Sequence, residues 1–365
     1  MTQKKLIIFM PSIEGGGVEK NLFIVTNYLS KKIDNLTVIT ASYKYKKKFN
    51  KKINLILPKK KIWNELGRRL KYLVCLILLI KFLLKNKNSA VFAFQANLYC
   101  VIVCKLLSIK IIIRSNSAPE GWSRNIIKKY LYKSIINKAD KVMVNSHDFK
   151  KSMKKKFDVN CKVIYNPLNN IEIKKKSKTK IKNLYPKKTI KIINVGRFVD
   201  QKDQITLLKS LNLIKDKINF HLILMGRGIL KKKLTHYISV NNLKKNITFI
   251  NFKKNPYPYI KQSDLFVLSS KFEGLPNVLL EAIVLKKFII SSNCPTGPRE
   301  ILLNGKAGYL FSVGDFKQLS QKILLFSKNS KKVNSFFVRK AFNSLQRFDY
   351  DANLNNYLNL VKSIM

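Results

Sequence analysis

The first half of the chain alternates short apolar runs with segments of helical pattern. The run at residues 5–10, KLIIFM, is followed by three glycines and then by a stretch with helical spacing. A strand, a glycine loop and a helix in this order open many nucleotide-binding α/β layers. Because buried parallel strands have continuous apolar sequences, the whole pattern predicts a doubly wound parallel sheet. Its further apolar runs lie at residues 36–40, 90–94, 110–114, 141–145 and 162–166.

The same pattern restarts in the second half, which predicts a second α/β layer. A lysine-rich polar stretch at residues 174–188 separates the two halves and is typical of a linker. We therefore expect an N-terminal lobe of residues 1–176 and a C-terminal lobe of residues 187–349. We expect residues 350–365 to form a helix that packs back on the first lobe. The apolar runs of the second half lie at residues 191–198, 220–228, 246–252, 264–270 and 287–293.

Basic residues dominate the charge of the chain. It has 72 Lys and Arg against 19 Asp and Glu, a formal net charge of +53, and residues 1–180 and 181–365 carry +31 and +22 of it. Only 9 of the 72 are Arg, and Arg is the better fork for bases and phosphates. We therefore expect no nucleic-acid partner. A general lysine bias, or non-specific attraction to anionic membrane surfaces, accounts for the excess.

Cysteine usage and hydropathy indicate where the protein works. The five cysteines form no C-x-x-C and no zinc spacing, and the first apolar run is too short for a signal peptide. The most lipophilic stretch, residues 72–84, has 13 residues and contains Lys81, whereas a membrane span needs about 20. It is either a buried helix or a helix that lies in one membrane leaflet. We expect a cytoplasmic protein, peripheral at the inner face of the cytoplasmic membrane.

The densest chemical motif is EGLPNVLLEA at residues 273–282, directly after an apolar run. Gly274 allows a tight turn, and Pro276 suits the first position of a helix. The helix would then point its free amides out of the carboxyl edge of the sheet, where α/β folds bind phosphates. Glu273 and Glu281 would lie on either side of this point, where both can accept hydrogen bonds from sugar hydroxyls. A plain strand–turn–helix with acidic residues near its start is the alternative.

The second motif is VGRFVDQKDQ at residues 195–204, after the first apolar run of the second lobe. Gly196 lets the backbone turn closely, and Arg197 and Lys202 project at the same edge of the sheet. Two cations at this place could hold a diphosphate. In so basic a protein they could equally be two surface cations.

The order of these motifs resembles glycosyltransferase family 4, whose members are retaining enzymes with the GT-B fold. In that fold two Rossmann-like lobes face each other across a cleft. The resemblance covers nearly the whole chain, and the run CPTGPREI is similar to that of bacterial surface-polysaccharide members. Its signatures are residues 15–20, 163–167, 196–203, 224–228, 269–282 and 291–302.

The resemblance implies a role for each motif residue. Arg197 and Lys202 match the cations on the donor diphosphate, and Glu273 matches the acid that holds donor-sugar hydroxyls near the anomeric carbon. Glu281 matches the carboxylate that takes both ribose hydroxyls. The remaining donor-binding candidates are Gly16, Gly17, Gly196, Gly274, Leu275 and Asn277. The two cations would replace a divalent metal, and the sequence contains no Asp-x-Asp, so we expect a metal-independent enzyme without a cofactor.

One feature departs from the family. Many members carry a His near the donor sugar in the first lobe, but the corresponding stretch here, residues 111–117, has none. Arg114 and Asn116 are the acceptor-side candidates in its place. The identity of a general base stays open.

These observations predict a retaining transferase that moves a hexose or N-acetylhexosamine from a nucleotide-diphosphate sugar. By resemblance the donor is a UDP-sugar, and the acceptor is a glycan or polyprenyl-linked glycan of surface polysaccharide biosynthesis. One alternative is a glycoside hydrolase with Glu273 and Glu281 about 5 Å apart, which leaves Arg197 and Lys202 without a purpose. The other is a non-enzymatic basic protein that binds membranes or nucleic acid, which leaves the order of the motifs unexplained.

Overall fold

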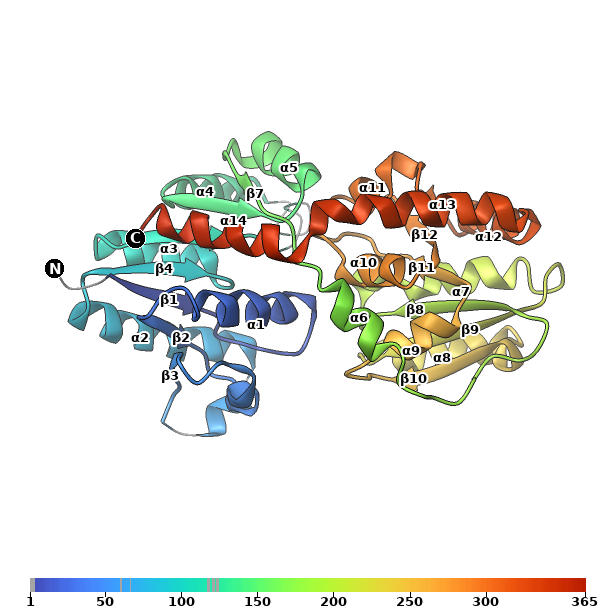
Figure 1. The fold of residues 1–365 in the computed structure, drawn as a ribbon, viewed down its shortest axis with the longest axis horizontal. Coiled ribbons are helices and arrows are strands. Elements are labelled where there is room, and N and C mark those ends of the chain that lie inside the picture. The colour runs from blue at the N-terminus through green and yellow to red at the C-terminus, as the bar shows by residue number, and fades with distance from the viewer. Residues whose placement is uncertain (1–3, 60, 66, 117–118, 120–121, 123–124) are drawn as a thin grey trace. The chain divides into compact units, whose positions relative to one another are not determined.

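The computed structural model describes residues 4–59, 61–65, 67–116, 119, 122 and 125–365 (Figure 1). The chain divides into two compact units. Unit 1 comprises Met1–Pro167 together with Tyr350–Met365, and unit 2 comprises Leu168–Asp349.

Unit 1 contains a parallel sheet of seven strands in the order β3-β2-β1-β4-β5-β6-β7. Its strands are β1 (Lys5–Phe9), β2 (Leu36–Ile39), β3 (Asn54–Ile56), β4 (Ser89–Ala93), β5 (Lys110–Arg114), β6 (Lys141–Val144) and β7 (Lys162–Val163). Its helices are α1 (Gly17–Leu29), α2 (Arg68–Lys85), α3 (Asn97–Leu106), α4 (Ile126–Asn137), α5 (His147–Phe157) and α14 (Tyr350–Lys362).

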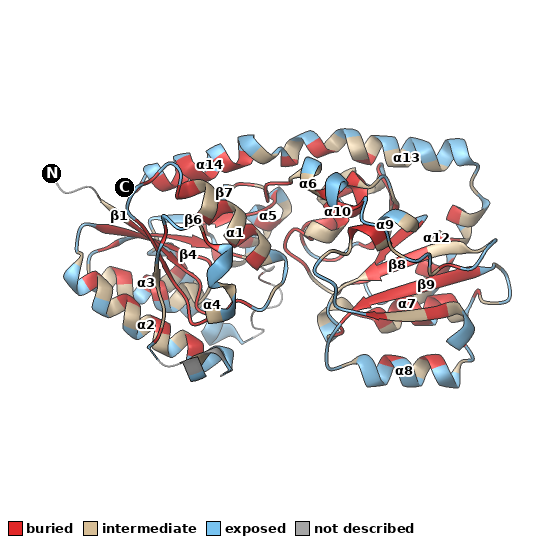
Figure 2. Ribbon diagram, turned by 60° about the horizontal axis from the view of Figure 1, so that its bottom comes forward, coloured by how far each residue is buried: buried red, intermediate tan, exposed pale blue. Residues whose placement is uncertain are grey.

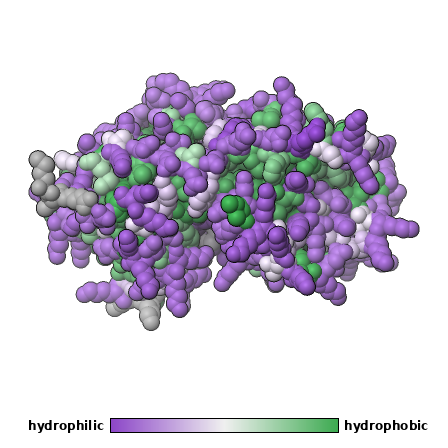
Figure 3. All heavy atoms as spheres, in the orientation of Figure 1, coloured by the Kyte–Doolittle hydropathy of each residue, from purple (hydrophilic) through white to green (hydrophobic). Residues whose placement is uncertain are grey.

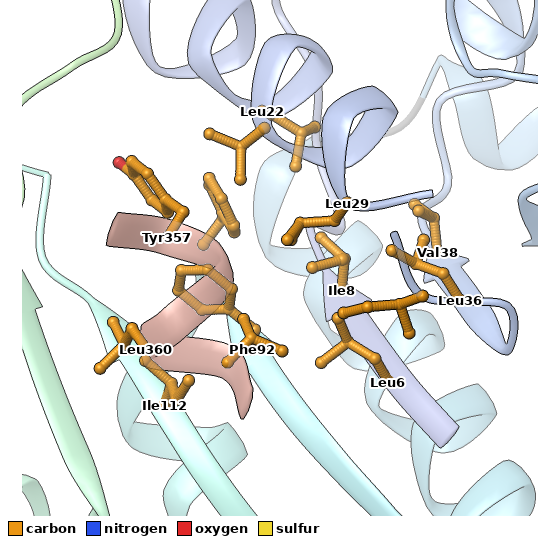
Figure 4. Packing of buried hydrophobic residues seen from close by; sticks show 14 of the residues in the cluster. Leu6, Ile8, Leu22, Leu29, Leu36, Val38, Phe92, Ile112, Tyr357 and Leu360 are labelled. Atoms are coloured by element: carbon orange, nitrogen blue, oxygen red, sulfur yellow. The ribbon is translucent and has the colours of Figure 1, made fainter. Parts of the chain in front are cut away.

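Both faces of this sheet are buried, which explains the continuous apolar runs. In β1, Leu6 and Ile8 point into a core closed by α1 and α14, whereas Ile7 and Phe9 point into a core closed by α2 to α5. Figure 4 shows the first of these cores. The C-terminal helix α14 completes it, because the ring of Tyr357 lies 6.2 Å from that of Phe92 in β4.

Unit 2 contains a parallel sheet of six strands in the order β10-β9-β8-β11-β12-β13. Its strands are β8 (Ile190–Val195), β9 (Phe220–Gly226), β10 (Ile247–Asn251), β11 (Leu265–Leu268), β12 (Phe288–Ser292) and β13 (Tyr309–Phe311). Its helices are α6 (Asn170–Lys176), α7 (Gln204–Asn212), α8 (Lys231–Val240), α9 (Tyr257–Gln262), α10 (Asn277–Val284), α11 (Pro298–Ile301), α12 (Phe316–Lys328) and α13 (Lys331–Asn343). The buried strands of this unit stand out in red in Figure 2.

The two Rossmann-like parallel sheets confirm the predicted fold class. The differences are local. The strands β3 and β13 were missed, because each has only three residues and leaves almost no periodic signal. The chain passes from unit 1 to unit 2 after Pro167, so residues 168–176, which we expected in the first lobe, belong to unit 2. The stretch expected to be a linker begins inside α6.

The lipophilic stretch at residues 72–84 lies within α2. One side of this helix is buried against the sheet through Cys75, Leu79 and Leu83, so the buried-helix alternative is correct for that side only. Within the part of the chain that the structure describes, no helix combines the length and hydropathy that crossing a membrane requires.

Candidate functional site

The carboxyl ends of β8, β11 and β12 bring the two predicted motifs together in unit 2. These strands are neighbours in a parallel sheet, so the loops that follow them leave at the same edge. The loop after β8 carries Lys202, and the loop after β11 carries Glu273. Lys202 Nζ lies 2.5 Å from Glu273 Oε1, and the side chains are only 16% and 8% exposed. The two motifs therefore share a buried ion pair.

Hydroxyl groups hold the Glu273 carboxylate and its loop in place. The Ser270 hydroxyl donates to Glu273 Oε1 at 2.6 Å. The Thr296 hydroxyl, on the loop after β12, donates to the backbone carbonyl oxygens of Glu273 and Gly274 at 2.6 and 3.1 Å. The Ser292 hydroxyl donates to the carbonyl oxygen of Ser270 at 2.6 Å. One hydroxyl thus binds the Glu273 carboxylate directly, and two others hold the backbone of its loop.

Further contacts join the loop after β8 to the loop after β11. The Ser269 hydroxyl donates to the carbonyl oxygen of Lys202 at 3.0 Å. Gln201 exchanges two hydrogen bonds with the other loop: its side-chain amide donates to the carbonyl oxygen of Phe272, and its own carbonyl accepts from the Lys271 amide. The position of the Lys202 ammonium therefore follows from the packing of the two loops.

Glu281 lies in the second turn of α10. Its Oε1 accepts a hydrogen bond from the Tyr257 hydroxyl at 3.3 Å, and both side chains are buried. The helix begins at Asn277, and Pro276 precedes it in an extended conformation rather than opening it. Gly274 and Leu275 are buried in the turn before the helix. The Glu281 carboxylate therefore lies about one turn into the helix that starts after Pro276, and its role toward a donor stays a prediction.

Arg197 differs from Lys202 in its surroundings. Its side chain is exposed at the end of β8, and the structure shows it no ion pair or side-chain hydrogen bond with any described residue. The fold therefore separates the two predicted cations: Lys202 is held by a carboxylate, and Arg197 is open to an anion from solution.

Close backbone packing explains two glycines of the predicted signatures that had no assigned role. A Cβ atom on Gly297 would lie 2.2 Å from the Gly274 carbonyl oxygen, and its φ is +84°. A Cβ atom on Gly226 would lie 1.8 Å from the Gly196 carbonyl oxygen. Both distances are shorter than any side chain tolerates, so these glycines let neighbouring loops approach the site.

Cys294, on the loop after β12, has an unreactive thiol. Burial, with a smaller contribution from the negative charge of Glu273, raises the pKa of Cys294 to about 12. Cys294 therefore stays protonated at neutral pH and is no nucleophile there.

In the glycine loop of unit 1, the Glu19 side chain binds backbone amides of the loop. Gly16 precedes α1, and Gly17 is the first residue of the helix. Glu19 accepts hydrogen bonds from the amides of Gly16 and Glu14 at 2.9 and 3.3 Å. Glu19 thus closes the glycine loop at the start of α1 with its own carboxylate. The donor-binding role of Gly16 and Gly17 stays a prediction.

The acceptor-side candidates lie at the end of β5 in unit 1. Arg114 is only 1% exposed, donates to Asn166 Oδ1 at 2.8 Å and lies 5.1 Å from the centre of the Phe94 ring. Asn116 is half-buried and donates to the Phe94 carbonyl oxygen at 2.7 Å. The burial of Arg114 favours a role in holding Asn166 over direct contact with an acceptor. The last residue of the predicted stretch, Ser117, lies outside the described residues.

Sequence reasoning missed Ser270, Thr296 and Tyr257 as site residues. Serine, threonine and tyrosine carry no spacing signal of their own, and each reaches the site only through tertiary structure. Within the described ranges, no group of His, Cys, Asp and Glu is arranged to hold a metal ion.

Two family models match this chain. Residues 175–341 match the model described as Glycosyl transferases group 1, and residues 15–170 match the model described as Glycosyltransferase Family 4. The first match lies in unit 2, and the second covers unit 1 from its glycine loop to β7. The chain belongs to the glycosyltransferases that combine these two domains.

Curated relatives share this family. An uncharacterized glycosyltransferase of Methanocaldococcus jannaschii is 34% identical over 197 residues, which are 51% of this chain and 48% of that relative. This match therefore spans about half the length of each protein. The Campylobacter jejuni N-acetylgalactosamine-N,N'-diacetylbacillosaminyl-diphospho-undecaprenol 4-alpha-N-acetylgalactosaminyltransferase is 25% identical over 369 residues, which cover 95% of this chain and 96% of that relative.

Solved structures share the fold. Anabaena HepE in complex with UDP-glucose matches with a TM-score of 0.78 at 16% identity, over 99% of this chain and 100% of that chain. Staphylococcus aureus TarM in complex with alpha-GlcNAc-glycerol and UDP matches with a TM-score of 0.75 at 16% identity, over 98% and 99%. At these identities the likeness shows the fold alone, which is the GT-B fold of glycosyltransferases.

Proposed function

We propose that this protein transfers a hexose or N-acetylhexosamine from a UDP-sugar to a polyprenyl-linked glycan, with retention of the anomeric configuration. The Campylobacter relative that spans almost the whole chain is named for an acceptor on diphospho-undecaprenol. The HepE structure is a complex with UDP-glucose, and the TarM structure is a complex with UDP. These names support the classes of donor and acceptor. Because such an acceptor is anchored in lipid, we place the reaction at the inner face of the cytoplasmic membrane.

One observation carries the proposal: the buried pair of Lys202 and Glu273 beside the start of α10. Burial of a charge is costly unless the charge is paired and hydrogen-bonded. A cation and a carboxylate kept together at a sheet edge, where α/β folds bind ligands, fit a ligand that carries both phosphates and hydroxyls. A nucleotide sugar has both.

The ammonium of Lys202 has three donors, so it can stay with Glu273 and still donate to a phosphate oxygen. Arg197 and the amides before α10 would take the other diphosphate oxygens. Glu281, held by Tyr257, would accept from the ribose hydroxyls. Glu273 would accept from hydroxyls of the donor sugar.

The reaction breaks the bond between the anomeric carbon and the diphosphate oxygen. The electron pair leaves with the UDP, the sugar carbon gains oxocarbenium character, and the acceptor hydroxyl forms the new bond and gives up its proton. Negative charge therefore grows on the diphosphate as the bond breaks. Fixed cations and amides interact with that charge more strongly in the transition state than before it, which accelerates the reaction.

We further propose that Arg197 and Lys202 perform the charge neutralisation that a divalent metal performs in other sugar transferases. Because each cation acts mostly on the transition state, its loss should lower turnover by roughly 10²–10³. Lysine at position 197 should not restore the full rate, since a point charge does not reproduce the guanidinium fork.

A panel of nucleotide sugars tests the proposal. The purified chain is heated with each compound, and UDP-sugars should raise the melting temperature by mass action, whereas the matching GDP- and ADP-sugars should do so less. The best stabiliser is then tested for transfer to polyprenyl-linked glycan extracted from membranes. Stabilisation by no nucleotide sugar, or release of free sugar without transfer, would contradict the proposed function.

A further inference from the structure

Three neighbouring helices of unit 1 cover the same face of its sheet. The helices α2, α3 and α4 all contribute to the core on that side, together with α5. Their core residues are Cys75, Leu79 and Leu83 in α2, Cys100, Val101 and Cys104 in α3, and Ile136 in α4. The opposite side of each helix consequently points away from the sheet.

The outer side of α2 is apolar as well. Leu70, Leu73 and Ile77 are 47%, 59% and 44% exposed, and Leu84 is 56% exposed. At 100° per residue these four positions fall within a narrow stripe on the side opposite Cys75. A helix that is apolar all round is normally buried all round. In α2, however, no described residue of unit 1 covers the outer stripe enough to bury it.

The two other helices repeat this arrangement. In α3, Leu106 is 80% exposed, and Tyr99 and Ile102 lie on the same outer stripe. In α4, Ile127 is 75% exposed and Tyr130 is 68% exposed. We call the exposed apolar residues of these helices the three-helix face: Leu70, Leu73, Ile77, Leu84, Tyr99, Ile102, Leu106, Ile126, Ile127, Tyr130 and Leu131. Exposed segments of α2 and α4 are pale blue in Figure 2.

The charge around this face has one sign. Residues 61–137, which contain all three helices, have 14 Lys and Arg and only 2 Glu. Lys81 and Lys85 flank the stripe of α2, and Lys128 and Lys129 are exposed within that of α4. Figure 3 shows another view of the molecule by hydropathy, in which hydrophilic residues predominate on the surface.

We propose that the three-helix face is a docking surface for an anionic lipid bilayer. Isoleucine and leucine side chains can enter the boundary between headgroups and acyl chains, tyrosines suit the headgroup level, and lysines attract anionic lipids. A second copy of this chain fits poorly, because it would bring a surface of the same positive sign against this one. Since α2, α3 and α4 lie flat on the sheet, the protein rests on one leaflet without spanning the bilayer.

The inference deepens the proposed function, because it assigns to unit 1 the lipid partner that a polyprenyl-linked acceptor requires. Its test measures lipid binding alone, so it can fail while the transferase proposal stands, and the reverse also holds. The probes are vesicles of phosphatidylcholine with and without 30% phosphatidylglycerol, a proportion of about one anionic lipid in three that suffices to attract polybasic surfaces.

Co-sedimentation of the full chain with these vesicles is the measurement. The wild-type protein should bind anionic vesicles and leave them in 1 M salt, where screening shortens to about 3 Å. The pair Ile127→Ser and Leu131→Ser should lower the affinity at least about tenfold, because both side chains lose apolar contact with lipid. The double variant Lys128→Glu, Lys129→Glu should lower the affinity for anionic vesicles at least about 25-fold, which is about fivefold for each lysine lost.

Matched controls lie in unit 2. Ile229 and Val240 are 87% and 66% exposed, so Ile229→Ser with Val240→Ser removes comparable apolar surface, and Lys232→Glu with Lys233→Glu removes comparable charge. Both controls should bind vesicles like wild type. Equal binding to neutral and anionic vesicles, or equal losses in test and control variants, would overturn the proposal. So would a dimer in sedimentation equilibrium that the Ile127→Ser, Leu131→Ser variant dissociates, because it would make the face a contact between copies.

Discussion

Lys202 and Glu273 form a buried ion pair that joins the loop after β8 to the loop after β11. A second ion pair, exposed to solvent, joins the same two loops. The buried pair measures 2.5 Å, with side chains 16% and 8% exposed. The exposed pair joins Lys271 to Asp200 at 2.6 Å, with side chains 39% and 81% exposed. Length and chemistry are nearly equal, so the two pairs differ almost only in their contact with water.

This contrast predicts different costs for two lysine substitutions. Lys202→Met leaves the Glu273 carboxylate buried without its cation, which should lower the free energy of unfolding by about 3–5 kcal/mol. Lys271→Met should lower it by no more than about 1 kcal/mol, because water screens the exposed pair. Urea unfolding followed by circular dichroism measures both. Equal midpoints for the two variants would show that the Lys202–Glu273 pair is screened as well.

The hydroxyl of Ser270 should act on catalysis through Glu273. Ser270→Ala removes one hydrogen bond to a carboxylate, worth about 1.5–3 kcal/mol, and leaves the carboxylate less well oriented. We expect kcat to fall at least about tenfold with little change in KM for the donor. Ser263→Ala is the control, because the Ser263 hydroxyl donates to the Ile260 carbonyl oxygen at the opposite edge of the sheet. A rise in KM without a fall in kcat would assign Ser270 to ground-state binding instead.

Glu281 should determine donor affinity. Glu281→Ala removes the proposed acceptor for the ribose hydroxyls and should weaken UDP binding by about 1.5–3 kcal/mol in calorimetry. Tyr257→Phe should weaken it less, because the Tyr257 hydroxyl donates to the Glu281 carboxylate and would act by orienting it. The double variant should then be no worse than Glu281→Ala. Additive losses would mean that Tyr257 contacts the nucleotide by itself, and unchanged affinity in Glu281→Ala would refute the ribose assignment.

Gly297 should be needed for space and not only for its backbone conformation. Gly297 and Gly314 both have left-handed φ angles, +84° and +78°, but only at Gly297 does a Cβ atom meet a neighbour, the Gly274 carbonyl oxygen. Gly314→Ala should therefore cost about 1 kcal/mol of strain and keep UDP affinity. Gly297→Ala should cost more and displace the turn before α10, so that UDP affinity falls. Similar behaviour of the two variants would show that the steric contact is relieved without effect on the site.

The two parallel sheets, and the position of each motif after an apolar run of the second half, could be predicted because both depend on local pattern. Continuous apolar runs indicated the parallel strands, and the position of Glu273 and Lys202 after such runs placed them at one edge. Their direct ion pair could not be predicted, since it depends on how the two loops pack. The same holds for Ser270, whose role follows only from its distance to a carboxylate.

Burial could not be predicted for residues whose chemistry suggests exposure. Arg114 was expected to face an acceptor, but it lies beneath the edge of the sheet with its charge against Phe94 and Asn166. Conversely, α2 was expected to be either buried or lipid-facing. Because the helix turns by 100° per residue, one side of it can be buried against the sheet while the opposite side is apolar and exposed. The glycoside hydrolase alternative rested on Glu273 and Glu281 alone, and the family matches leave it without support.

Arg197 provides the most direct test of the central claim that the edge of unit 2 binds the diphosphate of a UDP-sugar without a metal. The Arg197 side chain is exposed and makes no ion pair or hydrogen bond with any described residue. Arg197→Ala should therefore fold like wild type. The measurement is calorimetric titration of UDP in buffer with EDTA, with Arg339→Ala in α13 as the control for an exposed arginine. We predict one-to-one binding by wild type and Arg339→Ala in EDTA, and affinity about tenfold or more lower in Arg197→Ala, since a charge-assisted bidentate contact is lost. Binding by wild type only after addition of Mg²⁺ or Mn²⁺, or equal affinity in all three proteins, would contradict the account.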